Sequence, residues 1–536
     1  MSELDELISR LLINRKLETP EQISEFLNPP DPQTYSLAKV GIDPDSVNVA
    51  INLIKSHLNQ DHPICIYGDY DVDGITGTAI LWETLYQFSK SVFPHIPHRQ
   101  EEGYGLSQKG IDHCLEKGAK LIITIDNGIV AHEQIAYCRS RNCDLIVIDH
   151  HAPDNSPTQA NVLVHSVQTS AAGLAWFFCR EFSVRGKLPA TSSELLSLVA
   201  ISVICDLVPL LGINRSFAKY GLEQLNQTTR PGLLALFESA GIGEKVNVIN
   251  SYHVGFLIGP RLNAPGRLDY ALDSLRLLCT RSHTQARELA KHLNEINALR
   301  QDKTLASGNH AISRFKPESL PKLLIVSSPD YDEGVIGLIA AKLVETYHRP
   351  AVAISIKDDF SKGSARSIPG FHITDFLRRF DKTLSAVGGH AMAAGFSIPT
   401  SRLSTFIKKS EILAEKSISE EILVKNTRID AVVELSTMNY ELFAKLKEFE
   451  PFGLGNPRPV FQSPSVPVSG FHRLGSDLRH LKFMAGQTEA IYFSAPAGVE
   501  SAMETADLTY TLDLNIFNGK TTLQLVIKNI SISHKL

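Results

Sequence analysis

Three short apolar runs constrain the fold of this 536-residue chain more than any other feature. They occupy residues 63–67 (PICIY), 121–125 (LIITI) and 145–148 (LIVI), and helical patterns separate them. Apolar runs without alternation are typical of strands buried on both faces, as in a parallel sheet with helices on each side. The predicted fold class is therefore α/β, with a parallel sheet in the N-terminal half of the chain.

Acidic residues follow each predicted strand directly. GDYDVDG (residues 68–74) follows the first strand, Asp126 follows the second, and Asp149-His150-His151 follows the third. Because sites in open parallel sheets form beyond the carboxyl ends of the strands, we expect these side chains to meet at one edge. Asp206 interrupts the apolar stretch SVICDLVPLL, where an acid is costly to bury unless it is paired or metal-bound.

The three carboxylates of GDYDVDG repel one another, so this loop needs either a cation or full exposure to solvent. Its D-x-D-x-D-G opening is shared with the EF-hand calcium loop. That loop also needs an entering helix and a bidentate Glu at its twelfth position, which here is Ile80. A solvated acidic turn is the other structural alternative. Acids delivered by three successive strands favour a metal site over both.

The donor set indicates the kind of metal. Carboxylates with imidazole and no thiolate suit Mn²⁺ or Mg²⁺ better than structural zinc. The acids are too numerous for one cation, which favours two ions about 3.5–4 Å apart, bridged by a carboxylate. Such a pair lowers the pKa of a bridging water and suits the hydrolysis of a phosphoester or phosphoanhydride.

Charge and cysteine usage limit the surroundings in which the chain works. Lys and Arg number 53 and Asp and Glu number 58, a formal charge of −5, so any contact with nucleic acid depends on local basic patches. Seven cysteines without a CxxC pair are typical of a reducing compartment. The amphipathic N-terminus has no signal-peptide pattern, and the most apolar stretch, residues 197–213, is too interrupted to span a bilayer. We therefore expect a cytoplasmic protein that makes no membrane contact.

The rest of the chain changes pattern several times. Residues 271–320 are helical and charged, and alternation on both sides of Asn518-Gly519 predicts a β-hairpin with a type I′ turn. The expected divisions are an N-terminal helical segment, a metal-site domain, a connector helix, a second α/β domain, a helical linker region and a C-terminal β domain. Their expected ranges are residues 1–60, 61–270, 271–320, 321–400, 401–449 and 450–536.

GDYDVDG, IDNG, IDHH and the isolated Asp206 resemble the four motifs of the DHH phosphoesterase superfamily. Further motifs narrow the resemblance, because the chain is similar to the RecJ single-strand-specific 5′→3′ exonucleases from about residue 40 to its C-terminus. These motifs are EGYGL at 102–106, GPRLNAPGR at 259–267, EGVIG at 333–337, GSARS at 363–367, GGH at 388–390 and PFGLGNP at 451–457.

The resemblance implies a ligand set for two ions, Mn²⁺ or Mg²⁺. The implied metal ligands are Asp69, Asp71, Asp73, Asp126, His150 and Asp206. Three residues are expected to act in catalysis: Asp126 as the bridging ligand, His151 as a contact to the scissile phosphate, and Asp149 as the residue that orients His150.

The resemblance also implies a substrate-binding surface. A DHHA1-type second domain would close over the metal site, and an OB-fold C-terminal domain would grip single-stranded DNA. Arg99 would hold the 5′ end and Tyr104 would stack on a nucleotide. The residues expected to bind phosphates are Asn263, Arg267, Ser364, Arg366 and His390; guanidinium groups beside Ser and Gly independently suit an anion site.

The implied function is a single-strand-specific 5′→3′ DNA exonuclease that releases 5′-mononucleotides in repair and recombination. The resemblance further implies a single-strand-binding protein and a helicase as partners, and we expect a monomer. Two alternatives share the fold: a phosphoesterase for pyrophosphate, short oligonucleotides or cyclic dinucleotides, and a non-catalytic scaffold. The C-terminal β domain and the GPRLNAPGR stretch argue against the first, and the presence of every predicted ligand argues against the second.

Overall fold

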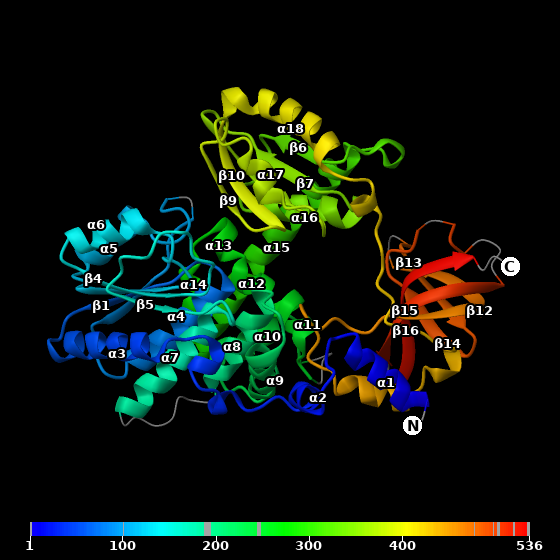
Figure 1. Cartoon of the computed structure of the whole chain (residues 1–536), viewed down its shortest axis with the longest axis horizontal. Coiled ribbons are helices and arrows are strands. Elements are labelled where there is room, and N and C mark those ends of the chain that lie inside the picture. The colour runs from blue at the N-terminus through cyan, green and yellow to red at the C-terminus, as the bar shows by residue number, and fades with distance from the viewer. Residues whose placement is uncertain are drawn as a thin grey trace.

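The computed structural model describes residues 3–99, 101–186, 194–243, 248–475, 478–496, 498–500, 504–517 and 520–532. Figure 1 shows three lobes: an N-terminal lobe with a central helical region, a second lobe above it, and a C-terminal barrel beside the N-terminus. Among the helices described, none is both long enough and apolar enough to cross a membrane. The domain divisions expected from the sequence remain predictions.

The first lobe contains the predicted parallel sheet, with strand order β2-β1-β3-β4-β5. Its strands are β1 (Ile64–Tyr67), β2 (Val92–His95), β3 (Leu121–Ile125), β4 (Asp144–Asp149) and β5 (Val162–His165). The three apolar runs form the central strands, where both faces are buried, so the α/β prediction is confirmed. The outer strands were not predicted, because β2 contains Pro94 and neither strand is a continuous apolar run.

Helices cover both faces of this sheet. One face packs against α3 (Pro44–Asn59), α4 (Val72–Leu85) and α7 (Ala171–Gly186). The other packs against α5 (Gln108–Glu116) and α6 (His132–Ser140), in a cluster that includes four of the seven cysteines. None of the seven cysteines forms a disulfide.

A helical region follows the sheet and leads to the second lobe. Its first helices are α8 (Glu194–Cys205), α9 (Gly212–Asn226) and α10 (Pro231–Ser239). It continues with α11 (Ser251–His253), a π-helix (Val254–Ile258), α12 (Gly259–Asn263), α13 (Pro265–Leu268), α14 (Leu272–Cys279) and the long α15 (His283–Ser313). Helix α15 packs against α10 in the first lobe and α16 in the second, so it connects the two lobes.

The second lobe is a mixed five-stranded sheet with the order β6-β7-β8-β10-β9. Strands β6 and β7 pair in parallel, and the other neighbours are antiparallel. The strands are β6 (Leu324–Ser328), β7 (Ala351–Ser355), β8 (Phe360–Arg366), β9 (Ala386–Gly389) and β10 (Ala393–Pro399). Helix α16 (Ile336–Tyr347) covers one face, and α17 (Ile373–Arg378) and α18 (Leu403–Ser417) cover the other.

The C-terminal lobe is a six-stranded sheet in which pairing of β12 with β15 closes five strands into a barrel, and β11 adds to the edge at β12. Its strands are β11 (Ala431–Val432), β12 (Phe461–Leu474), β13 (His480–Ala485), β14 (Thr488–Tyr492), β15 (Thr505–Phe517) and β16 (Lys520–Ile532), and α19 (Tyr440–Lys447) precedes β12. The predicted hairpin strands, β15 and β16, pair antiparallel up to Phe517 and Lys520. The predicted turn residues Asn518 and Gly519 lie outside the described residues.

The N-terminus packs on the barrel and not on the sheet that follows it in the sequence. Helices α1 (Glu3–Ile13) and α2 (Pro20–Leu27) bury Leu11 and Phe26 against Phe449 and Phe461, and Figure 1 shows α1 beside the barrel. Arg215 of α9 is 1% exposed and connects the first lobe to α2 and to the segment that follows α19. Its guanidinium donates hydrogen bonds to the carbonyl oxygens of Phe26, Glu448, Phe449, Glu450 and Pro451.

Candidate metal centre and phosphate pocket

The loop between β1 and α4 places three aspartates at the carboxyl edge of the sheet. Asp71 begins α4 as its N-cap, because its Oδ1 accepts hydrogen bonds from the backbone N–H groups of Asp73 and Gly74. Asp69 is fully buried, and neither of its carboxylate oxygens has a hydrogen-bond partner. A Cβ on Gly74 would lie 2.6 Å from the backbone N of Asp69, so this tight loop requires glycine there.

Asp73 is held in place by backbone N–H groups and a serine. The N–H groups of Ala171 and Ala172, at the start of α7, donate to its two carboxylate oxygens at 2.7 and 2.8 Å. Ser202 Oγ donates to Oδ1 at 2.6 Å. Ser202 is on α8, four residues before Asp206, which directly follows the last residue of that helix; this spacing is the one sequence signal for its role. Neither Ser202 nor the N–H groups of Ala171 and Ala172 carry a sequence motif that predicts this contact.

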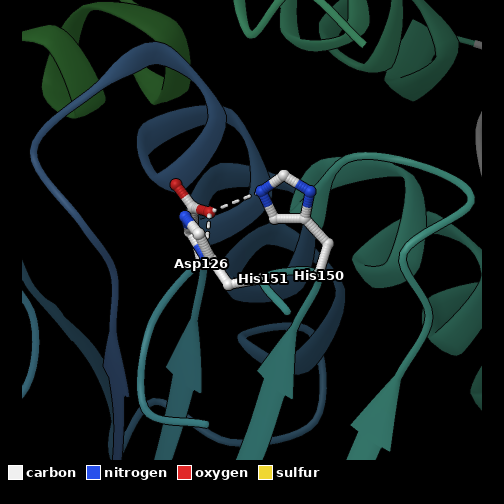
Figure 2. Close-up of side chains that lie close together, drawn as sticks. All are labelled: Asp126, His150 and His151. Carbon is white, nitrogen blue, oxygen red and sulfur yellow. Dashed lines mark ion pairs between the residues drawn. The ribbon is translucent and has the colours of Figure 1, made fainter. Parts of the chain in front are cut away.

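Asp126 and His150 meet between the ends of β3 and β4 (Figure 2). His150 Nε2 lies 3.2 Å from Asp126 Oδ1, 3.6 Å from Asp73 Oδ2 and 3.6 Å from Asp206 Oδ2. Asp126 adopts φ 66°, a left-handed conformation that is uncommon outside glycine and occurs in functional loops. The predicted convergence of distant acids is therefore present.

Three overlapping groups in this centre could each hold a cation. They are Asp69, Asp71 and Asp126; Asp73, His150 and Asp206; and Asp126, His150 and His151. Asp126 belongs to two groups, as expected of a bridging ligand. The unpartnered buried oxygens of Asp69 and Asp126 are hard donors that a divalent cation would satisfy, so the residues fit Mn²⁺ or Mg²⁺.

Burial and mutual repulsion dominate the electrostatics of this centre without a metal. Burial, followed by neighbouring carboxylates, raises the pKa of Asp69 and Asp126 well above the usual range. The same causes raise the pKa of Asp206 to about 9. The protein therefore holds protons here that a divalent cation would displace.

Binding of Mn²⁺ should therefore stabilise the fold more strongly as the pH rises. An aspartate whose folded pKa exceeds its unfolded value of about 3.9 holds its proton more tightly in the folded state. The metal-free fold is therefore most stable at low pH, where this carboxyl group is protonated, and that stability is lost as pH rises through the folded pKa. The metal-free melting temperature should fall with pH, and the shift caused by Mn²⁺ should grow between about pH 6 and pH 8, as metal binding displaces protons. Differential scanning fluorimetry with Mn²⁺ or EDTA measures both; a shift that shrinks as pH rises would contradict this account.

Asp149 contacts His151, not His150. Its Oδ1 accepts a hydrogen bond from His151 Nδ1 at 2.8 Å, and its Oδ2 accepts one from the N–H of Ile129. The expectation that Asp149 orients His150 is therefore corrected, because its hydrogen-bonded imidazole is that of His151. Burial alone would lower the pKa of His151, but the hydrogen bond and charge of Asp149 outweigh it and raise that pKa. The hydrogen bond thus favours the protonated imidazole of His151 and fixes its Nδ1 toward Asp149, which leaves Nε2 free to face another group.

The second lobe reaches the centre through His390. Its ring lies parallel to that of His151, at an interplanar angle of 13° and a centroid distance of 6.4 Å. Gly334 approaches Arg267 so closely that a Cβ would lie 2.2 Å from the Arg267 carbonyl oxygen. The two lobes therefore contact each other directly beside the metal ligands.

A pocket of about 470 Å³ opens between the lobes beside this contact. Five predicted substrate-binding residues line it together: Arg99, Tyr104, Arg267, Ser364 and Arg366. Arg366 is bound to Ser364 Oγ at 3.1 Å, and Arg99 lies over the ring of Tyr70. Asn263 does not line the pocket; its Oδ1 accepts a hydrogen bond from the N–H of Val72 and supports the aspartate loop.

Glu102 positions the loop that carries Arg99 and Tyr104. Its carboxylate contacts His95 Nε2 at 2.8 Å and accepts the backbone N–H of His98 at 3.0 Å. The Tyr67 hydroxyl donates to the carbonyl of Gly105 in the same loop. Glu102 belongs to the EGYGL motif, and the sequence alone predicted no role for it.

A parallel sheet with clustered aspartates and a histidine at its carboxyl edge, joined to a mixed-sheet lobe, defines a metal-dependent phosphoesterase of the DHH class. In agreement, residues 63–203 match the DHH family N-terminal domain and residues 321–416 match the DHHA1 domain. Residues 429–529 match the RecJ OB domain. The chain belongs to the RecJ family of single-stranded-DNA-specific exonucleases.

Individual relatives agree with this assignment. The chain is 31% identical to the single-stranded-DNA-specific exonuclease RecJ of Bacillus subtilis over 98% of its own length and 68% of the relative's. It superimposes on the crystal structure of Thermus thermophilus RecJ in complex with Mn²⁺ with a TM-score of 0.84 and 27% identity, covering 99% of this chain and 76% of that one. The Mg²⁺ complex of the same protein gives a TM-score of 0.78 at 26% identity, covering 98% and 74%.

Proposed function

We propose that this protein degrades single-stranded DNA from its 5′ end and releases 5′-mononucleotides, using two divalent ions. The observation that carries the proposal is that the arginine-lined pocket adjoins the metal centre. Tyr70, next to Asp69 in the aspartate loop, lines the pocket, and the second lobe reaches the centre where the ring of His390 stacks on that of His151. A strand whose 5′ end enters the pocket would present its first phosphodiester to the aspartate cluster.

The proposed ion ligands are Asp69, Asp71, Asp73, Asp126, His150 and Asp206. Divalent ions bound there would activate the attacking water and stabilise the charge that develops on the phosphate. His151, oriented by Asp149 and with its pKa raised by that carboxylate, would donate a hydrogen bond from Nε2 to a phosphate oxygen.

The pocket residues would bind and orient the strand. Arg99, Arg267 and Arg366 are suited to bidentate phosphate contacts. Tyr104 is 60% exposed at the pocket, where its ring could stack on a terminal base. The C-terminal barrel would hold the strand further from the 5′ end. We further propose that the protein acts as a cytoplasmic monomer beside a helicase and a single-strand-binding protein.

Degradation of end-labelled strands tests this function. The purified protein with Mn²⁺ should convert a 5′-phosphorylated single strand to mononucleotides, beginning at the 5′ end, and should leave the matching blunt duplex intact. A strand blocked only at its 5′ terminus should resist, while a 3′-blocked strand should be degraded. Degradation that begins at the 3′ end, or that proceeds on dinucleotides alone, would refute the proposal.

Arg366→Met should weaken recognition of the 5′ phosphate. The guanidinium is held beside Ser364 Oγ. Its loss removes a charge-assisted contact to the phosphate worth about 1.5–3 kcal/mol, which corresponds to a roughly 10- to 150-fold weaker interaction. We expect the kcat/KM for a 5′-phosphorylated strand to fall by this factor, and to fall less for a 5′-hydroxyl strand. Arg314→Met, far from the pocket on the end of α15, is the matched control; equal losses on both strands would contradict a phosphate role.

A further inference from the structure

An exposed pair of stacked aromatic rings lies on the helical segment between the barrel and the metal centre. Tyr252 and Phe256 are 56% and 68% exposed, and their ring centroids are 4.9 Å apart with an interplanar angle of 26°. Large rings that remain in water offer π-faces on which nucleobases stack without sequence preference. Neither residue takes part in the site described above.

The segment that carries this aromatic pair connects the barrel to the aspartate loop. It runs from α11 through the π-helix to α12, and Figure 1 shows α11 and α12 near the centre of the molecule. At its start, Ser251 Oγ donates to the carbonyl of Phe452, in the segment that enters the barrel. At its end lies Asn263, which supports the aspartate loop. Asn263 lies seven positions after Phe256, about 10 Å along a helix axis.

The segment is fixed firmly against the metal-site helix α8. A Cβ on Gly259 would lie 2.4 Å from Cys205 Sγ, so glycine permits this close approach immediately before Asp206. Cys205 Sγ also contacts the carbonyl of Val254 in the π-helix. π-Helical turns occur frequently at functional sites, and a rigid support favours a defined stacking surface.

Arginines without acidic partners extend from the pocket toward the same segment. Burial, and then the charges of Arg99, Arg300 and Arg366, lower the pKa of Arg267 to about 10. Burial and the charge of Arg261, on α12, lower the pKa of Arg300. Among the described residues, no carboxylate forms an ion pair with Arg261, Arg267, Arg300 or Arg366; Arg261 donates instead to the neutral oxygens of Asn294 and of the Leu257 carbonyl. A row of uncompensated cations is complementary to a phosphodiester chain.

We propose that Tyr252 and Phe256 form a stacking platform for bases of the single strand on its way from the barrel to the metal centre, with Arg261 and Arg300 beside its phosphates. The platform deepens the proposed function and rests on it. Its occupant is single-stranded DNA, because the exposed rings lie on the same segment as Arg261, and this segment leads to the aspartate loop.

The double variant Y252A/F256A tests the platform. Binding of a 5′-phosphorylated twenty-nucleotide oligothymidylate is measured by fluorescence anisotropy in EDTA, and cleavage of this strand and of a dinucleotide is measured with Mn²⁺. We expect the affinity to fall at least about 10-fold. The ratio of kcat/KM for the long strand to that for the dinucleotide should fall by a similar factor. Phe256→Trp should retain binding, whereas Phe256→Leu, which lacks a π-face, should not.

Phe360→Ala is the matched control, because Phe360 is 54% exposed at the start of β8 and does not line the pocket. This control variant should change neither the affinity for the oligothymidylate nor the ratio of kcat/KM for the long strand to that for the dinucleotide. The platform would be overturned if the double variant bound the strand as tightly as the wild type, or if its kcat/KM fell equally for the long strand and the dinucleotide. Because binding in EDTA needs no catalysis, a wild-type protein that binds through this pair without cleaving the strand would refute the exonuclease proposal and leave the platform standing.

Discussion

In an Asp126→Asn variant, cleavage of single-stranded DNA should fall at least about 1,000-fold, since the loss of one shared ion ligand removes several kcal/mol of transition-state stabilisation. Asp126 is 2% exposed and belongs to two of the three candidate ion groups, so one substitution disturbs both. Single-turnover rates with Mn²⁺ on a 5′-labelled strand measure this loss.

The same substitution should stabilise the metal-free protein. Asp126 Oδ1 has no hydrogen-bond partner, although the imidazole nitrogens of His150 and His151 lie 3.2 and 3.8 Å away, and burial and neighbouring aspartates raise its pKa well above the usual range. An asparagine removes the repulsion while keeping the shape. We expect the melting temperature in EDTA to rise and the further rise caused by Mn²⁺ to shrink. Asp154→Asn, an exposed aspartate nearby, is the control; a variant that keeps more than about one tenth of wild-type activity would contradict the ligand role.

Arg215→Met should cost about 3–5 kcal/mol of folding free energy, as expected when one partner of a buried charged network is removed. The guanidinium is the shared donor for carbonyls from α2 and from the segment after α19, and it lies 3.9 Å from the centre of the Phe26 ring. Without it, buried carbonyl oxygens lose their donors, and the N-terminal helices, the first lobe and the barrel lose their common contact.

Urea unfolding and limited proteolysis measure this effect. The Arg215→Met midpoint should fall, and cleavage should appear in the segment between α18 and β12. Arg215→Lys should lie between wild type and Met, because an ammonium donates to fewer carbonyls than a guanidinium. Arg276→Met, whose side chain is 56% exposed, should change stability by no more than about 0.5 kcal/mol. An unchanged midpoint in Arg215→Met would contradict the bridging role.

The central strands and the acids that follow them were accessible to sequence reasoning because both signals are local. A continuous apolar run predicts a strand buried on both faces, and an aspartate directly after it must lie at the sheet edge. The outer strands β2 and β5 give no such run, so they were missed.

Contacts between distant segments were not accessible in this way. The N–H groups that hold Asp73 belong to alanines, whose side chains give no hint of this role. Asp149 has two neighbouring histidines in the sequence, and only the backbone geometry selects His151. Asn263 looked like a phosphate ligand, but the fold directs its Oδ1 to the N–H of Val72.

The sequence by itself determined the α/β core and the donor chemistry at its edge, because strand burial and ligand type depend on residues close together in the chain. Only the tertiary structure decided which donors share an ion, how the two lobes form one phosphate pocket, and why the N-terminal helices pack on the barrel. These outcomes depend on backbone donors and on contacts across hundreds of residues, such as that of Leu11 with the Phe449 cluster, and side-chain identity alone does not specify them.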